Sequence, residues 1–141
     1  MEYLERFLKA QEFYYDIALK EVKSGKKVSH WIWFIFPQLA KLGNSYNAKY
    51  YGIVNFEEAE LYLAHPILGN RIREITNALL QHKRLSAVDV FGGVDALKVL
   101  SSMTLFDLIS PNDIFKEVLN RFFLGRFDEE TLNLYKLRYY L

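Results

Sequence analysis

The sequence of 141 residues contains no cysteine. This absence excludes a disulfide framework, a thiolate metal site and a thiol nucleophile. Residues 1–6 already carry charged side chains, which is not the pattern of a secretion signal. Together these two features predict a cytoplasmic protein.

Long hydrophobic runs are also missing. The longest near-continuous run, from Trp31 to Phe36, has six residues, whereas a helix that spans a membrane needs about twenty. We therefore expect no transmembrane segment and no membrane partner. We interpret this aromatic run as part of the core rather than as an interfacial anchor.

An excess of charge of one sign is absent as well. Eighteen basic and seventeen acidic side chains give a formal net charge of +1, which is too balanced for a general nucleic-acid binder. The one basic cluster, formed by Lys20, Lys23, Lys26 and Lys27, also suits the negative end of the helix expected there. We expect no nucleic-acid partner.

Motifs for metals and phosphates are missing too. The three histidines, His30, His65 and His82, do not have the spacing of a metal site, so we predict no metal. Gly92-Gly93 lacks the further glycines and the lysine-serine ending of a phosphate loop, and no Gly-x-Ser-x-Gly motif occurs. We predict no cofactor and find no support for covalent catalysis.

The sequence is rich in apolar residues, at 51%, and in aromatic residues, at 16%. A chain of this length and composition predicts one globular domain over residues 1–141 with a well-packed core. Apolar residues recur at helical spacing over residues 2–24, and Gly25 supplies a helix stop. Gln11 interrupts the apolar stripe of this predicted helix, which marks it as a residue of interest.

The segment Trp31 to Phe36 has the composition of a strand. No second strand with an alternating pattern follows it, and an isolated strand would leave its backbone groups unpaired. We therefore predict a short buried helix, capped by Ser29 and ended by Pro37.

Capping residues and apolar periodicity predict the remaining helices. We expect them at residues 55–63, 66–82, 93–109, 111–125 and from 128 onward, with a linker at residues 83–86, and residues 45–51 could form about two further helical turns. The predicted fold is a single compact all-α domain of six or seven helices.

Three polar residues of the predicted helix 93–109 lie on one face: Asp95, Lys98 and Ser102 follow at i, i+3 and i+7. In one interpretation Asp95 and Lys98 form an exposed ion pair, which contributes about 0.2–0.5 kcal/mol. In the other, the row lines a pocket, because apolar residues flank it on both sides. The sequence leaves both interpretations open.

Four residues around the aromatic run carry chemistry of their own. His30 can move protons near neutral pH, and the indole rings of Trp31 and Trp33 can stack on a flat ligand or on a cation. Gln38 follows directly after Pro37. Each also has a purely structural interpretation, in which the tryptophans belong to the core and the histidine is a satisfied structural residue.

Motifs spread over the whole sequence occur together in one known family. In the first half they are Ala10-Gln11, Glu21, Gly25-Lys26-Lys27, His30-Trp31-Ile32-Trp33-Phe34-Ile35-Phe36-Pro37-Gln38-Leu39, Leu42-Gly43-x-Ser45, Glu58-Ala59 and Leu68-Gly69-x-Arg71. In the second half they are Phe91-Gly92, Asp95, Lys98 and Ser101-Ser102-Met103-Thr104-Leu105-Phe106. This set closely resembles the bacterial domain-of-unknown-function family 1810.

The resemblance implies a compact all-α fold and agrees with a helix over the aromatic run. It implies no established activity. Some members carry a calpastatin label, but this sequence shows no disordered inhibitor repeats, and we set that label aside. The motifs include a polar set that is more typical of a shared site than of a shared core: Gln11, His30, Trp33, Gln38, Ser45, Arg71, Asp95, Lys98 and Ser102.

The leading hypothesis is that these side chains line a pocket for a small polar ligand, such as a nucleotide or an ADP-ribose-like molecule, which the protein hydrolyses. An indole ring stacks on the ligand, cationic side chains neutralise phosphate, and Asp95 or His30 transfers a proton. The predicted ligand-binding residues are Gln11, Trp31, Trp33, Gln38, Ser45, Arg71, Lys98, Ser101 and Ser102.

The alternative is an interaction module without chemistry. The C-terminal residues Tyr135, Leu137, Tyr139, Tyr140 and Leu141 could form a docking face or a contact between copies in a homo-oligomer. They could equally pack on their own domain. The sequence therefore leaves open whether the protein is an enzyme.

Overall fold

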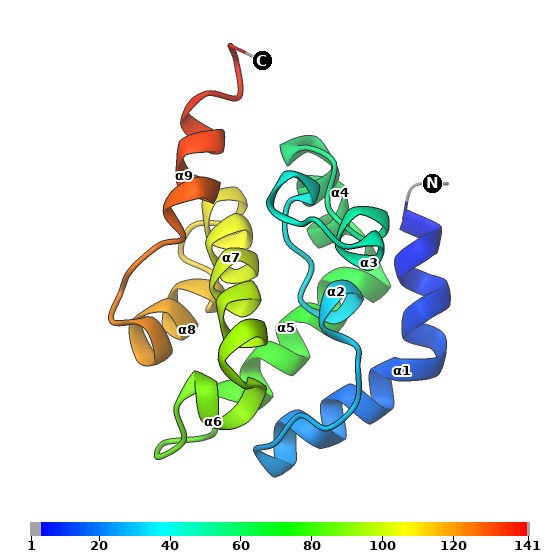
Figure 1. Ribbon diagram of the computed structural model, residues 1–141, viewed down its shortest axis with the longest axis vertical. Coiled ribbons are helices and arrows are strands. Elements are labelled where there is room, and N and C mark those ends of the chain that lie inside the picture. The colour runs from blue at the N-terminus through cyan, green and yellow to red at the C-terminus, as the bar shows by residue number, and fades with distance from the viewer. Residues whose placement is uncertain (1–3, 141) are drawn as a thin grey trace.

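Three long helices organise the molecule: α1 (Glu5–Ser24), α5 (Pro66–Leu80) and α7 (Gly93–Ile109). The structure is a computed structural model that describes residues 4–140. Figure 1 shows α1 along one side of the molecule and α7 near its middle, with α5 running between them and α8 on the far side of α7. The second half of α7 is buried on all sides, since residues 101–107 are all buried, and this helix forms the centre of the core.

The remaining elements pack around this framework. They are α2 (Ile32–Ile35), the 3-10 helix η2 (Ala40–Leu42), α3 (Tyr46–Tyr50), α4 (Phe56–Ala64), α6 (Ala87–Phe91), α8 (Ile114–Phe123) and α9 (Glu129–Lys136). Helices α8 and α9 pack against α7, and α4 packs against both α5 and α7. The expectation of an all-α fold is confirmed for residues 4–140, which contain no strand beyond an isolated bridge between Leu39 and Ile53.

The expected number of helices, six or seven, is too low, because residues 4–140 form nine α-helices. The difference lies in short helices such as α6, which was not predicted. Ser86 and Asp89 form a reciprocal capping box at its start, with Asp89 N donating to Ser86 Oγ at 3.0 Å and Ser86 N donating to the Asp89 carboxylate at 2.9 Å. A helix of five residues is too short for apolar periodicity to reveal it.

Two predicted helix starts also need correction. Helix α2 exists, but Ser29 does not cap it: its N-cap residue is Trp31, which makes no capping hydrogen bond with its side chain. Helix α8 begins at Ile114 rather than at residue 111. Its cap is Asp113, whose carboxylate accepts hydrogen bonds from Ile114 N at 2.7 Å and from Arg73 of α5.

The helix α2 is enclosed by the core. Trp31 and Phe36, at its two ends, are almost fully buried and both pack edge-on against Phe91 of α6. Two backbone hydrogen bonds tie the following segment to Ile53, from Ala40 N to Ile53 O at 2.9 Å and from Ile53 N to Gln38 O at 2.8 Å. This packing fixes the face that α2 presents to α7.

Within residues 4–140, none of the helices combines the length and the apolar character that crossing a membrane requires.

Candidate functional site

The site residues expected from the sequence fall mainly into two groups on either side of α2. The first group, which we call the lysine-tryptophan site, consists of Lys27, Trp31, Trp33, Asp95 and Lys98. It joins the loop after α1, the start of α2 and the first two turns of α7. The second group surrounds Gln11 and is described further below.

The carboxylate of Asp95 is the centre of the lysine-tryptophan site. It lies 2.9 Å from the ammonium of Lys27 and 3.6 Å from that of Lys98. The Lys27 side chain is only 7% exposed, and those of Asp95 and Lys98 are 19% and 25% exposed. Asp95 and Lys98 therefore do not form a fully exposed pair on a solvated helix face. They belong to a half-buried ion triad whose closest pair links α7 to the loop after α1.

Glu21, near the end of α1, fixes the loop that carries Lys27 and Trp31. Its carboxylate accepts four hydrogen bonds: from Val28 N at 2.8 Å, from Ser29 N at 2.9 Å, from Ser29 Oγ at 2.6 Å and from Trp31 Nε1 at 2.9 Å. Burial alone would raise the pKa of Glu21, but these hydrogen bonds outweigh it and lower the pKa to about 2. The ionised carboxylate thus organises residues 28–31.

We predict that Glu21 makes the stability of the protein depend on pH in acid. The pKa of Glu21 is lowered by folding from its ordinary value of 4.5, so its contribution to stability is present above that value and is lost as the pH falls toward 2. Glu21→Gln should lower the free energy of unfolding by about 2 kcal/mol near pH 6. The difference from the wild type should shrink steadily toward pH 2.5 in urea unfolding experiments.

The control for this prediction is Glu12→Gln, which removes a carboxylate from the exposed side of the same helix. It separates the loss of the hydrogen-bonded network from the general effect of removing one negative charge. A difference between wild type and Glu21→Gln that stays constant from pH 6 to pH 2.5 would contradict the role given to Glu21.

Next to Lys98 lie polar groups that the protein leaves unsatisfied. The Lys98 ammonium is 5.8 Å from the centre of the Trp33 ring, and Ser102 follows one helical turn later, roughly 6 Å further along α7. Trp33 Nε1 and Ser102 Oγ are both buried, and neither has a hydrogen-bond partner among the described residues. A buried polar group without a partner costs about 1–3 kcal/mol. Because both atoms are closed off from solvent, a ligand that supplied the missing partners would recover this energy only if the side chains around them open to admit it.

The second group, the glutamine cluster, consists of Gln11, Tyr15, Tyr62 and Arg71. The side-chain amide of Gln11 donates to Phe34 O of α2 at 2.8 Å and to the Tyr62 hydroxyl at 3.0 Å. Arg71 donates to the side-chain carbonyl oxygen of Gln11 at 3.5 Å, and its guanidinium carbon lies 5.0 Å from the centre of the Tyr15 ring. Gln11 is 2% exposed, so its amide groups are engaged inside the protein.

The other expected residues are placed separately. Ser45 caps α3, with its hydroxyl accepting from Ala48 N at 3.1 Å, and Ser101 donates to Leu97 O at 3.2 Å within α7. Gln38 takes part in the backbone pairing with Ile53. His30 is exposed, beside the buried Trp31. The structure thus brings Trp31, Trp33, Asp95 and Lys98 together and sets Gln11 with Arg71 apart from them.

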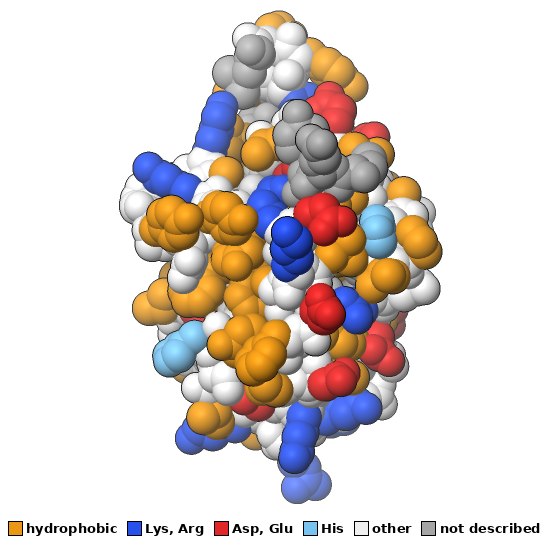
Figure 2. Space-filling model, turned by 90° about the vertical axis from the view of Figure 1, so that its right-hand side faces the viewer, with side chains coloured by type: hydrophobic (Ala, Val, Ile, Leu, Met, Phe, Trp, Pro, Cys, Tyr) orange, Lys and Arg blue, Asp and Glu red, His pale blue; other side chains and the backbone are white. Residues whose placement is uncertain are grey.

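The predictions from sequence missed Lys27 as a member of the site and Glu21 as the residue that holds its loop in place. Lys27 was grouped with a basic cluster at the end of a helix, whereas its ammonium is paired with Asp95 and also donates to Ser29 O at 2.6 Å. Lys20, Lys23 and Lys26 of that cluster are exposed. Figure 2 shows the α1 side of the molecule, with basic side chains at its lower end and charges of both signs elsewhere. The presence of Glu21 and Lys27 in the family motifs was the one available signal.

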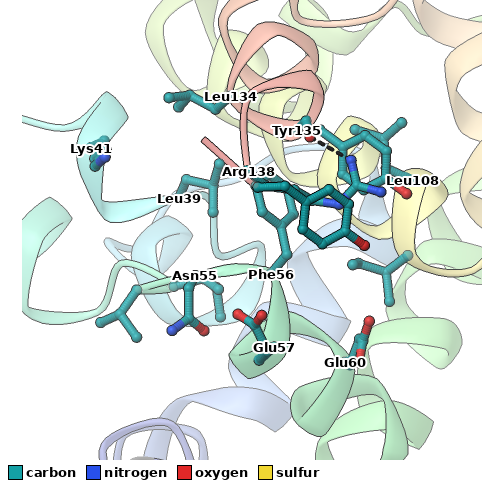
Figure 3. Close-up of a pocket in the computed structure, with 14 residues that line it drawn as sticks. Leu39, Lys41, Asn55, Phe56, Glu57, Glu60, Leu108, Leu134, Tyr135 and Arg138 are labelled. Carbon is teal, nitrogen blue, oxygen red and sulfur yellow. Dashed lines mark hydrogen bonds between the residues drawn. The ribbon is translucent and has the colours of Figure 1, made fainter. Parts of the chain in front are cut away.

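A pocket of about 480 Å³ lies elsewhere, between the start of α4, the end of α7 and the segment from α9 to residue 139. Figure 3 shows this α4–α9 pocket. None of the predicted catalytic or ligand-binding residues lines it, whereas Tyr135 and Tyr139 of the possible docking face do. Leu108 and Ile109 of α7 line its wall, whereas Asp95 and Lys98 lie roughly 15–20 Å away along the same helix.

The C-terminal residues only partly fit a docking face. Tyr135 packs edge-on against Phe56 of α4, with 5.2 Å between ring centres, so this side chain belongs to its own domain. Leu137, Tyr139 and Tyr140 are exposed, and Leu141 lies outside the described residues. A homo-oligomer formed through this segment stays a prediction.

The architecture and the site define a small all-helical domain with a half-buried ion triad beside two tryptophans. The chain belongs to the family described as protein of unknown function (DUF1810), whose model matches residues 1–135. It is similar to the conserved hypothetical protein Rv1873 from Mycobacterium tuberculosis, at 42% sequence identity and a TM-score of 0.91. The match covers 93% of this chain and 94% of that chain. A search of curated proteins finds no match.

Proposed function

We propose that the protein binds a small anionic ligand at the lysine-tryptophan site, and that the ligand is a nucleotide or an ADP-ribose-like molecule. The observation that carries this proposal is the pair of unsatisfied groups beside Lys98, Trp33 Nε1 and Ser102 Oγ. A phosphate or sugar oxygen can accept a hydrogen bond from each of them. The same oxygen atoms can also pair with the Lys98 ammonium.

The charges around the site support an anion rather than a cation. Asp95 is neutralised by Lys27 at the shorter distance of 2.9 Å, and Lys98 is its second, more distant partner. Glu21 is saturated by four hydrogen-bond donors. Lys98 therefore has the capacity to pair with a phosphate. The partly exposed ring of Trp33 offers a surface on which a base can stack.

Hydrolysis of the ligand is the second step of the proposal. Asp95 or His30 is the residue that would transfer a proton to or from the attacking water. The ion pairs of Asp95 favour a binding role for that carboxylate, because both of its oxygen atoms already face ammonium groups. The exposed imidazole of His30 has no such restriction.

Isothermal titration of the full chain with ADP-ribose, ATP and inorganic phosphate tests the proposal. We expect saturable binding of at least one phosphate-containing ligand and a loss of about tenfold or more in affinity for Lys98→Ala, which corresponds to about 1.4 kcal/mol. Trp33→Phe keeps a ring but removes the N–H group, so it should weaken binding by a smaller factor. Chromatography of the mixtures after incubation reports any hydrolysis.

The matched control is Lys9→Ala, which removes an exposed ammonium from α1 and should leave the affinity unchanged. Circular dichroism and thermal unfolding check that each variant is folded. If no phosphate-containing ligand binds to the wild type, or if Lys98→Ala binds as tightly as the wild type, the proposal is wrong.

A further inference from the structure

The α4–α9 pocket has the chemistry of a second site, separate from the lysine-tryptophan site. Its volume of about 480 Å³ falls within the range of small-molecule sites, which is roughly 300–1,000 Å³. Its apolar side is formed by Leu39, Ile53, Leu108 and Leu134. The aromatic pair of Phe56 and Tyr135 adds flat surfaces.

Two carboxylates stand on one side of this pocket. Glu57 and Glu60 are three positions apart on α4, so both project from the same face of the helix. Both are exposed, and neither has an ion-pair or hydrogen-bond partner among the described residues. Figure 3 shows them below the pocket, facing the side on which Arg138 lies. The pocket thus combines apolar and aromatic walls with two carboxylates that form no ion pair among the described residues, while Lys41 and Arg138 are the cationic side chains that line it.

Arg138 shows what kind of group these walls accept. Its guanidinium carbon lies 3.6 Å from the centre of the Tyr135 ring and 4.4 Å from that of the Tyr139 ring. Among residues 4–140, its one side-chain hydrogen bond is to Tyr135 O, at 2.5 Å, within the same turn of chain. A planar cation is therefore held against tyrosine rings in the pocket, while most of its five N–H donors are left for other partners.

We propose that the α4–α9 pocket binds a guanidinium group from outside the chain, and that Arg138 occupies the tyrosine surface as a stand-in when no ligand is bound. The entering guanidinium stacks on Tyr135 and donates hydrogen bonds to the carboxylates of Glu57 and Glu60. Two carboxylates favour a guanidinium over an ammonium, because its planar fork can stack and donate to both at once. The entering guanidinium belongs either to a free guanidino compound or to an arginine side chain of another protein.

The experiment is a titration of the full, isotope-labelled chain followed by NMR, with agmatine as the probe. We expect saturable shifts of the resonances of Tyr135, Phe56 and residues 57–60. Cadaverine, a diamine of similar length and equal charge in which an ammonium replaces the guanidinium, should bind at least about tenfold more weakly. Absence of saturable shifts with agmatine, or equal binding of the two probes, would overturn the proposal.

Three variants locate the site. Glu57→Gln combined with Glu60→Gln should weaken agmatine binding about tenfold or more, whereas the control Glu117→Gln, on the exposed side of α8, should not. Arg138→Ala should tighten binding several-fold, because it removes the competing guanidinium. Unchanged affinity of the double glutamine variant would show that agmatine binds elsewhere and would contradict the assignment of the site. Weaker binding to Arg138→Ala would contradict the proposal that Arg138 occupies the tyrosine surface in the absence of a ligand.

A second arm distinguishes the two sources of the guanidinium. A short peptide with one central arginine is compared with free agmatine and with the same peptide carrying lysine. Tighter binding of the arginine peptide than of agmatine assigns the site to a protein partner, and the reverse assigns it to a small molecule. Peptides that bind equally with arginine and with lysine count against the proposal. The outcome of these agmatine and peptide titrations is independent of the nucleotide titration, because the lysine-tryptophan site and the α4–α9 pocket share no residue.

Discussion

Replacing Arg6 with alanine is expected to lower the free energy of unfolding by about 3–5 kcal/mol, since it leaves a buried carboxylate without its counter-charge. The Arg6 guanidinium nitrogen Nη2 lies 2.7 Å from Glu58 Oε1, and these two side chains are only 12% and 5% exposed. Arg6 also donates to Gly52 O at 2.8 Å, so it ties α1 to both α4 and the segment before it. Chemical unfolding followed by circular dichroism measures the loss.

Further variants separate the charge pair from simple loss of packing. Arg84→Ala, at an exposed position in the loop before α6, should change stability by less than about 0.5 kcal/mol. In a double-mutant cycle with Glu58→Gln, the loss caused by Arg6→Ala should become clearly smaller, because no charge then remains buried. If the loss is the same in both backgrounds, the ion pair is not the cause of the stabilisation.

Replacing Gln11 with leucine should lower the free energy of unfolding by about 3 kcal/mol. The substitution leaves Phe34 O and the Tyr62 hydroxyl without the donor that they now share, and each buried polar group without a partner costs about 1–3 kcal/mol. Burial raises the pKa of Tyr62 above its ordinary value. Its hydroxyl therefore stays protonated, and it still needs a hydrogen-bond partner inside the protein.

The control for this prediction is Gln81→Leu. Gln81 is exposed at the end of α5, and within the described part of the chain its side-chain amide donates only to Asn77 of that helix. This substitution should leave the free energy of unfolding nearly unchanged. A Gln11→Leu variant as stable as the wild type would show that the hydrogen bonds to α2 and α4 do not hold these helices together.

The long helices could be predicted from the sequence, because their signals are local. The stop of α1 at Gly25, which has a left-handed conformation with a φ of 88°, and the start of α5 at Pro66 follow from residue type alone. The cap of α2 could not be predicted in this way. Ser29 is a good capping residue, but its backbone N–H and its hydroxyl both donate to Glu21 instead, a partner brought near by the turn after α1.

The candidate site was only partly predictable for the same reason. The spacing of Asp95 and Lys98 along one helix is visible in the sequence, and both reach the lysine-tryptophan site. The closest partner of Asp95 is Lys27, which is distant in sequence and marked by no local pattern. Gln11 stood out as a polar interruption of an apolar stripe, but its partners lie on α2, α4 and α5. Tertiary packing decides which polar residues meet.

The placement of the tryptophans gives this protein a built-in optical reporter. The chain has only two tryptophans, and both belong to the lysine-tryptophan site. Trp31 is fully buried, with its indole N–H held by Glu21, so its emission should stay constant as long as the fold is intact. Trp33 is partly exposed beside the Lys98 ammonium. With excitation at a wavelength that tyrosine does not absorb, changes in emission without unfolding should therefore arise mainly from Trp33. Occupancy of the α4–α9 pocket, which neither tryptophan lines, should leave this tryptophan emission unchanged.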